Sequence, residues 1–170
     1  MKKIKFAVFL LFGLALANCG YQFVKTPTLP GGLQTLHVNV LANNTGETGI
    51  ETIFTNDILY ELLRAGQGLV ADQGRADGEL SGAITNLRIE TVAKRDTMIS
   101  LERRVVCYID LRLTDRSGTT VWSARDLKDA ETFYVITDNK LATEKNQKDA
   151  LRRVSRRLAE KVYYRLTDNF

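Results

Sequence analysis

The chain has 170 residues, of which 44% are hydrophobic, and this length is enough for one folded domain with a sizeable core. Its formal net charge is +4, but three lysines lie in a leader that we expect to be removed, which leaves +1 (4 − 3). This near-neutral balance argues against a nucleic-acid-binding protein, which would need a strongly basic surface.

The first 18 residues are typical of an export signal. Lys2, Lys3 and Lys5 form a positive start, and Phe6 to Ala17 is an unbroken run of apolar or small residues. As a helix, this run would span about 18 Å, well short of the roughly 30 Å hydrocarbon core of a bilayer. We therefore predict a signal peptide over residues 1–18 rather than a transmembrane helix.

The run ends in Leu16-Ala17-Asn18-Cys19, which is similar to the lipobox of bacterial lipoproteins. The lipid would be attached to the Cys19 thiolate, although Asn18 stands where glycine, alanine or serine is usual. Each buried methylene contributes about 0.8 kcal/mol, so two or three acyl chains on Cys19 would anchor the protein firmly. Gly20 favours the outer membrane, because an aspartate there retains such proteins in the inner membrane of enteric bacteria. The alternative is an ordinary signal peptide that ends near a cysteine.

Residues 19–34 are predicted to be a lipidated N-terminus and tether. Pro27, Pro30 and the pair Gly31-Gly32 interrupt this stretch, which favours an extended chain with no helix. Residues 35–170 are then predicted to form one domain.

The domain begins with an alternating segment, Thr35–Leu41, which predicts a half-buried strand with Leu36, Val38 and Val40 on its inner face. The segment Thr48-Gly49-Ile50-Glu51 resembles a capping box and predicts a helix that runs to about Arg64. Its core-facing stripe would comprise Ile50, Ile53, Phe54, Ile58 and Leu62. Gly66 and Gly68 suit the end of this helix.

Three strands are predicted in the middle of the chain. Glu79–Val92 alternates but slips out of phase, which predicts a bulge near Asn86, and it should lie parallel to the first strand through a right-handed crossover. Arg103–Thr114 alternates most clearly, and Asp115–Gly118 should close a hairpin with glycine in the left-handed conformation. Thr119–Val135 is the fourth strand, with an interruption expected near Asp126.

A final helix is predicted from about Thr143 to Leu166, with an apolar stripe flanked by arginines. The element order is then β-α-β-β-β-α. We expect an α+β two-layer sandwich, in which two helices pack on one face of a four-stranded mixed sheet and the other face stays polar and open.

Catalytic and metal-binding patterns are weak. His37 is the only histidine and is predicted to lie on the outer face of a strand. A zinc site would therefore lack its other ligands, and a serine nucleophile would have only His37 as a base. Gly66–Ala71 fits a dinucleotide-binding pattern but follows a helix, so it is better interpreted as a helix end. Cys107 alternates with the apolar residues and should be a buried, inert thiol. We therefore predict no enzyme, no cofactor and no metal.

Two groups of cations can each be interpreted in two ways. One lies on the predicted strands and their connection and comprises Arg88, Lys94, Arg95, Arg103, Arg104 and Arg112. The other flanks the last helix and comprises Arg152, Arg153, Arg156, Arg157, Lys161 and Arg165. Both could simply be solvated surface. Alternatively, arginine could bind phosphate or carboxylate groups through its planar fork of donors.

The whole pattern resembles the LptE family, the lipopolysaccharide-assembly lipoproteins of Gram-negative outer membranes. The resemblance rests on short motifs in a fixed order: Cys19-Gly20-Tyr21, Leu29-Pro30, Leu36–Val40, Asn44-Thr45, Tyr108–Leu111, Asp115–Trp122, Phe133-Tyr134 and Ala150. It covers nearly all of the mature chain, although the family often has proline where Asn39 stands.

The resemblance implies a non-enzymatic protein that plugs the outer-membrane barrel LptD, assists its assembly and takes part in lipopolysaccharide transport. Lys94, Arg95 and Arg103 are the residues that we expect to contact lipopolysaccharide. The expected location is the outer membrane, through the lipid on Cys19, with the domain facing the periplasm and the barrel lumen. The alternative is an auxiliary lipoprotein of an envelope lipid transporter or a pilotin for a secretin.

Overall fold

The structure, a computed structural model, describes residues 28–65, 68–94 and 101–167. Its strands are β1 (Leu36–Val38), β2 (Ala42–Asn43), β3 (Gly78–Lys94), β4 (Leu101–Asp115) and β5 (Thr120–Val135). They form one sheet in the order β1-β3-β4-β5, and β2 also pairs with β3. The helices are the short 3-10 turn η1 (Pro30–Gly32), α2 (Ile50–Ala65) and α3 (Lys140–Thr167).

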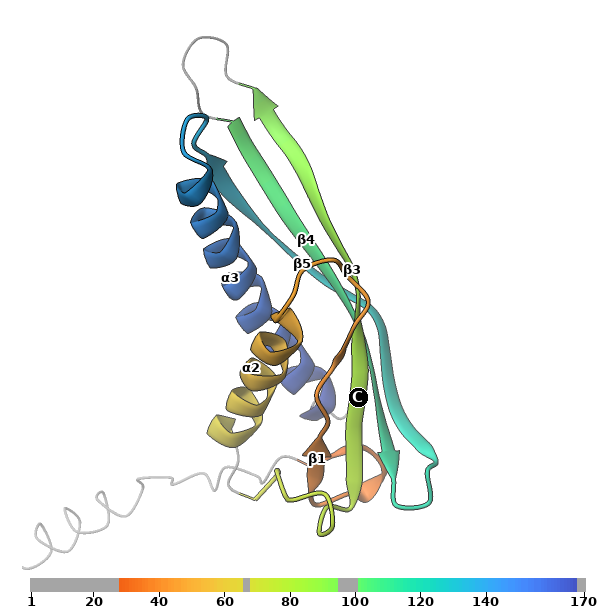
Figure 1. The fold of residues 1–170 in the computed structure, drawn as a ribbon. Coiled ribbons are helices and arrows are strands. Elements are labelled where there is room, and N and C mark those ends of the chain that lie inside the picture. Colours follow the sequence, from red (N-terminus) through yellow and green to blue (C-terminus); the bar gives the residue numbers. More distant parts are fainter. Residues whose placement is uncertain (1–27, 66–67, 95–100, 168–170) are drawn as a thin grey trace, which may run out of the picture.

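Both long helices lie on the same side of the sheet (Figure 1), which confirms the predicted α+β arrangement. Helix α3 packs along β5 and reaches β4, and α2 packs beside α3. Strands β1 and β2 run parallel to β3, whereas β4 is antiparallel to both of its neighbours, β3 and β5. Within the described ranges, no helix is both long and apolar enough to cross a membrane.

The core lies between the sheet and the helices. Alternate residues of β4, namely Val105, Cys107, Ile109, Leu111 and Leu113, are buried on the helix side as predicted. The facing stripe of α3 is also buried and includes Leu151, Val154, Leu158, Val162 and Leu166. Apolar surface buried between the sheet and the helices stabilises the two layers by about 25 cal/mol per Å².

Two predicted irregularities are confirmed. The pairing of β3 with β4 shifts between Ile84 and Asn86, so one extra residue reverses the faces of β3. In β5 the register with β4 shifts opposite Asp110, where Asp126 has a positive φ of 51°. The interruption near Asp126 is thus a bulge within one continuous strand. The hairpin between β4 and β5 also follows the prediction, with Gly118 at φ 83°.

The first strand is shorter than predicted, and Val40 was placed on the wrong face. Val38 pairs with Leu80 and Ala42 pairs with Ala83, so four steps along this segment match three along β3. The extra residue reverses the alternation, which leaves Val40 68% exposed and buries Leu41 at 2%. The Leu41 N–H donates to Thr55 Oγ1 of α2 over 3.1 Å, which fixes the inward turn.

The expected tether is not extended throughout the part that the structure describes. Residues Pro30–Gly32 form η1, so the expectation of no helix is wrong there. The physical reason is burial, since Leu29 is 2% exposed and belongs to the core cluster. Gly31 has a φ of 69°, and a Cβ at this position would lie 2.9 Å from Cβ of Val121 on β5. The division at residue 34 between tether and domain stays a prediction.

The start of α2 also differs from the predicted capping box. The helix begins at Ile50, so Gly49 rather than Thr48 is the residue before it. The Glu51 carboxylate accepts hydrogen bonds from its own backbone N–H, from Asn43 Nδ2 and from the Gly49 N–H, and these bonds lower the pKa of Glu51. The capping box predicted that Glu51 would accept from the Thr48 N–H, and the structure has it accept from the Gly49 N–H, one residue later.

We predict that Gly82→Ala destabilises the domain. A Cβ at Gly82 would lie 2.1 Å from the backbone oxygen of Asp110, and a backbone atom of a central strand cannot move away cheaply. The free energy of unfolding, measured by denaturant titration, should fall by about 2 kcal/mol or more. Gly46→Ala is the matched control, because no atom lies within 4 Å of that Cβ. Equal stability of the two variants would contradict the close approach of β3 and β4.

Candidate functional site on the open face of the sheet

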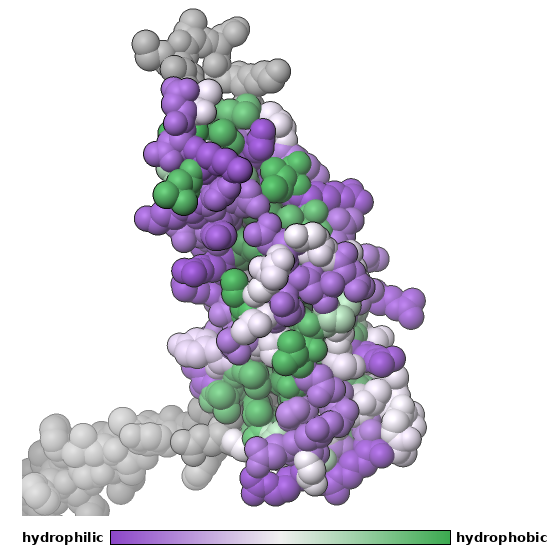
Figure 2. Space-filling model, in the orientation of Figure 1, coloured by the Kyte–Doolittle hydropathy of each residue, from purple (hydrophilic) through white to green (hydrophobic). Residues whose placement is uncertain are grey.

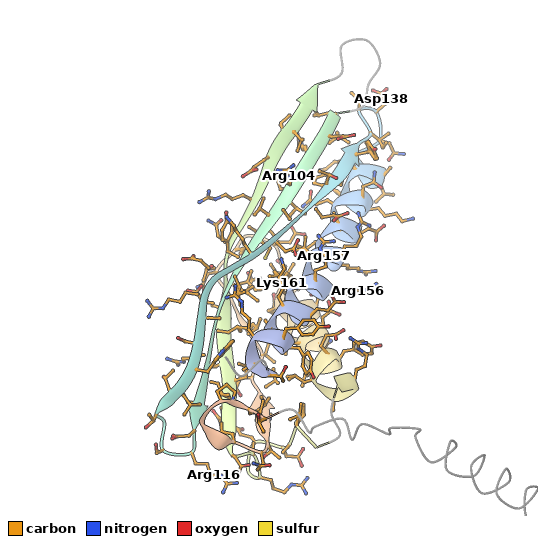
Figure 3. All side chains as sticks on the ribbon, turned by 180° about the vertical axis from the view of Figure 1, so that it is seen from behind. Arg104, Arg116, Asp138, Arg156, Arg157 and Lys161 are labelled. Carbon is orange, nitrogen blue, oxygen red and sulfur yellow. The ribbon has the colours of Figure 1, made fainter. Side chains whose placement is uncertain are left out.

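The basic flank of α3 divides into paired and unpaired cations. Arg157 contacts Asp129 (Nη2 to Oδ1, 3.0 Å) and Glu131 (Nη1 to Oε2, 2.9 Å) on β5. Arg153 also contacts Glu131 at 2.9 Å, and Lys161 contacts Asp129 at 2.6 Å. We call these five residues the α3–β5 cluster. Figure 3 shows Arg157 and Lys161 where α3 meets the sheet, while Arg156 lies on the other side of the helix. Half of the predicted flank therefore attaches α3 to the sheet.

Asp129 is the most enclosed acid of the α3–β5 cluster, with a side chain 11% exposed. Burial alone would raise its pKa, but hydrogen bonds from Arg157 and Lys161 outweigh burial and hold the pKa of Asp129 below its usual value. The same contacts raise the pKa of Arg157. Both groups are thus charged in the folded protein, and the cluster is an ionic attachment at any physiological pH.

The open face of the sheet is the side away from the helices, and it carries the other cations. Strand register defines five outward rows, each centred on an even residue of β4 from Arg104 to Arg112. Each row holds one cation; in order along the strands these are Arg104, Arg88, Lys128, Arg125 and Arg112. We call this set the cation ladder. Figure 3 shows Arg104 on the sheet, apart from the α3–β5 cluster.

The cation ladder has no ion pair within the part of the chain that the structure describes, in contrast to the α3–β5 cluster. Arg112 donates to Ser81 Oγ over 3.2 Å. Arg88 and Lys128 both lie over the ring of Tyr108, with Cζ and Nζ at 5.7 and 5.8 Å from its centroid. Such contacts orient the two cations at an exposed site but leave their charge unneutralised.

Two hollows follow the cation ladder. The larger, of about 730 Å³, holds Arg112 and Arg125. Its other lining residues are mostly small or hydroxylated: Asn44, Ser81, Gly82, Ala83, Thr85, Asp110, Leu111, Thr120 and Ser123. The smaller hollow, of about 380 Å³, holds Arg104, Lys128 and Tyr108 beside two acids, Glu90 and Asp129, of which Asp129 is already paired with Arg157 and Lys161. The open face thus offers charged donors above a floor of short polar side chains.

The residues predicted to contact lipopolysaccharide are not all on this face. Arg103 pairs with Thr91 and Phe133, so its register places it on the helix side, one residue from Arg104 on the open side. Lys94 pairs with Leu101 at the far end of β3. Arg95 and Cys19 lie outside the described residues, so their roles stay predictions. The sequence pattern missed Arg125 and Lys128, because a bulge and cross-strand register decide their position.

The remaining chemical candidates have ordinary environments. His37 Nδ1 lies 3.3 Å from the Ala71 carbonyl oxygen in a half-buried position. Cys107 is fully buried as predicted, and burial raises the pKa of its thiol to about 12, which suppresses the reactive thiolate. Among the described residues, no cluster of three histidine, cysteine or acidic side chains could hold a metal ion.

The fold and the open face define a class: a small two-layer α+β domain with one sheet face covered by helices and one left free. Solved structures of this shape include the minor lipoprotein from Acinetobacter baumannii, at 16% identity over 79% of this chain and 90% of that one, with a TM-score of 0.52. Lipoprotein B from Nitrosomonas europaea is 9% identical over 87% and 90%, with a TM-score of 0.57. PelC from Paraburkholderia phytofirmans, solved as a dodecamer, is 21% identical over 81% and 89%, with a TM-score of 0.50. At these identities the likeness shows the fold alone.

A family model narrows the class. The model of LptE, described as lipopolysaccharide-assembly, matches residues 33–166, which is most of the described domain. The chain therefore belongs to the LptE family, and the family resemblance predicted from the sequence is confirmed. It is a member of a non-enzymatic lipopolysaccharide-assembly family of the Gram-negative envelope. A search of curated proteins found no match.

We predict that Asp129→Asn weakens the attachment of α3. The free energy of unfolding at pH 7 should fall by about 1–2 kcal/mol, allowing for solvent screening of the partly exposed partners. Because the folded-state pKa of Asp129 is lowered, its contribution is present above about pH 4 and is lost as the pH falls through that lowered value. The difference between wild type and variant in urea titrations should therefore shrink below about pH 4.

The control for this experiment is Asp72→Asn, which removes the ion pair between Asp72 and Arg75. Both side chains of that pair are about 80% exposed (80% and 79%), so its loss should change stability by less than about 0.5 kcal/mol. A pH-independent loss in Asp129→Asn would count against an ionic role for the cluster.

Proposed function

We propose that the protein is an outer-membrane lipoprotein, held by lipid on Cys19, that plugs the barrel LptD, helps it to assemble and takes part in lipopolysaccharide transport to the cell surface. The observation that carries the proposal is the LptE family match, which spans residues 33–166. Proteins of this family act without catalysis. The buried thiol of Cys107 is consistent with a binding role rather than a chemical one.

The shape of the domain supports insertion along its length. Strand β3 has 17 residues, which at about 3.3 Å per residue gives a sheet roughly 55 Å long. The described chain starts at one end of this sheet, beside β1, and β3 ends at the other (Figure 1). A lipid at the N-terminal end would therefore hold one end near the membrane while the far end, where β3 finishes and β4 begins, reaches away from it.

The far end combines apolar and basic residues. Its exposed hydrophobic side chains are Ile89, Val92, Tyr134, Ile136 and Leu141. Figure 2 shows separate hydrophobic spots among hydrophilic side chains near this end. Lys94 and Arg103 lie on the neighbouring strand ends, and Arg95 follows Lys94. Since lipopolysaccharide carries both acyl chains and phosphates, we propose that this end contacts it through Lys94, Arg95 and Arg103.

The plug proposal predicts contact between the open face and a barrel wall. A photo-crosslinking amino acid at Thr132 or Ser123, both on exposed outward positions of β5, should capture a large outer-membrane barrel in native membranes. The same positions in a Cys19→Ala chain are the control, because loss of the lipid should release the protein from the outer membrane and abolish the adduct. Capture of a secretin or a phospholipid-transport protein, with normal surface lipopolysaccharide, would favour the alternative functions.

The far-end proposal predicts that Lys94→Ala, Arg95→Ala and Arg103→Ala together weaken binding of intact lipopolysaccharide. The loss should be largest at low ionic strength, because salt screens exposed charges over about 10 Å at 0.1 M. Binding can be measured by surface plasmon resonance at several salt concentrations. The control is Lys140→Ala, Lys145→Ala and Lys148→Ala, three exposed cations of α3. Unchanged affinity in the first variant would return its residues to ordinary solvated surface.

A further inference from the structure

The spacing of the cation ladder is regular. Its five rows follow one another at every second residue of β4, from Arg104 to Arg112. Second neighbours on a strand lie about 6.7 Å apart, so the ladder extends over roughly 27 Å. The same rows carry three carboxylates, Glu90, Asp110 and Asp126, so the cations are in excess by two (5 − 3). Asp110 Oδ1 already accepts from the Asp126 N–H over 2.8 Å.

These cations are available to a ligand. On the helix side, each cation of the α3–β5 cluster contacts a carboxylate. The distances are 2.9 Å for Arg153, 3.0 Å for Arg157 and 2.6 Å for Lys161. Ladder cations contact none within the described residues, although Glu90 lies in the same row as Arg104. Two of them, Arg88 and Lys128, lie over the Tyr108 ring, which orients them without neutralising their charge. An anionic ligand would therefore gain charge-assisted hydrogen bonds from the ladder.

The lining of the hollows decides what kind of anion fits. A simple phosphate would use one or two cations, whereas five rows in a line suit a chain with several negative groups. Beside Arg112 and Arg125 lie the hydroxyls of Ser81, Thr85, Thr120 and Ser123, which can donate to and accept from the hydroxyls of a sugar.

We infer that the open face binds an anionic oligosaccharide, that is, a sugar chain bearing phosphate or carboxylate groups, along the cation ladder. The inference rests on the proposed function, because it assigns the sugar part of lipopolysaccharide to the open face and its acyl end to the far end of the sheet. Arg104 and Lys128 hold anionic groups in one hollow, and Arg88, which lies over the same Tyr108 ring, adds a charge beside it. Arg112 and Arg125 hold them in the other, where the surrounding hydroxyls bind the sugar ring.

The test uses the full folded chain and lipopolysaccharide from which all acyl chains have been removed, so that the apolar contacts proposed for the far end are absent. Isothermal titration calorimetry at low and high salt should show binding that weakens as ionic strength rises. Arg104→Gln, Arg112→Gln and Lys128→Gln together should weaken it by about tenfold or more. Arg104→Lys with Arg112→Lys keeps the charges and should retain most of the affinity.

The matched control is Arg152→Gln, Arg156→Gln and Arg165→Gln, which removes three exposed cations of α3 that make no ion pair among the described residues. It changes net charge by the same amount and should alter affinity by less than about twofold. An equal loss in both variants would overturn the inference, since it would show only non-specific attraction. Tighter binding of a polyglutamate peptide, or of the oligosaccharide after its phosphates are removed, would also overturn the inference.

The barrel crosslink and the binding of intact lipopolysaccharide are measured on the same ladder variant. If wild type gives both signals and the variant binds the deacylated oligosaccharide as wild type does, the ladder inference fails and the proposed function stands. If wild type gives neither signal, the proposed function fails, and the assignment of the open face to lipopolysaccharide fails with it.

Discussion

One-sided burial of β4 is the constraint on which the rest of the structure depends. Side chains of a strand alternate between two faces, and here Val105 to Leu113 give every second position to the core. Helix α3 must then lie against that face, because its own apolar stripe has no other surface to cover. The intervening positions of β4 consequently lie on the open side, where only Val106, at 8% exposure, is apolar and buried. The polar residues at the other positions do not compete with packing.

The apolar contact between α3 and the sheet is interrupted by acidic residues of β5, and the α3–β5 cluster pairs them with cations of the helix. Asp129 and Glu131 occupy inward positions of the edge strand, in register with Cys107 and Val105 of the core. Two half-buried carboxylates without partners would be costly, and cations of α3 supply the partners. The pairing also fixes α3 along the strand direction, since Arg153, Arg157 and Lys161 are spaced one turn apart and meet acids two residues apart.

The sequence predicts the elements well because each carries a local pattern. Periodicity of 2 or 3.6 identifies β4, α2 and α3, and the loss of phase near Asn86 correctly indicates a bulge. Prediction fails where a non-local contact decides. The extra residue between Val38 and Ala42 depends on pairing with β3, and the burial of Leu29 depends on a core formed by residues far along the chain.

The candidate site was predictable only in part, for the same reason. Arginines of α3 and of the strands look alike in the sequence, and both groups could have been solvated surface or an anion site. What separates them is the position of two acids on β5, which neutralise one group and not the other. Arg103 and Arg104 illustrate the point, because one residue of register puts them on opposite faces.

Two bulges then determine what the open face carries. Before the shift at Asn86, the even residues Leu80 and Ile84 of β3 face the core, so an unbroken strand would turn Arg88 inward as well. On β5, Leu127 and Ala124 both face the core only because the chain gains a residue at Asp126, and Arg125 is thereby turned outward. The positive φ of Asp126 is unusual for a residue other than glycine and marks the position where this gain occurs. Without these two irregularities, the open face would lose two of its five cations, and two charges would be buried. The same local departures from ideal strand geometry thus complete the apolar core on one side of the sheet and the row of cations on the other.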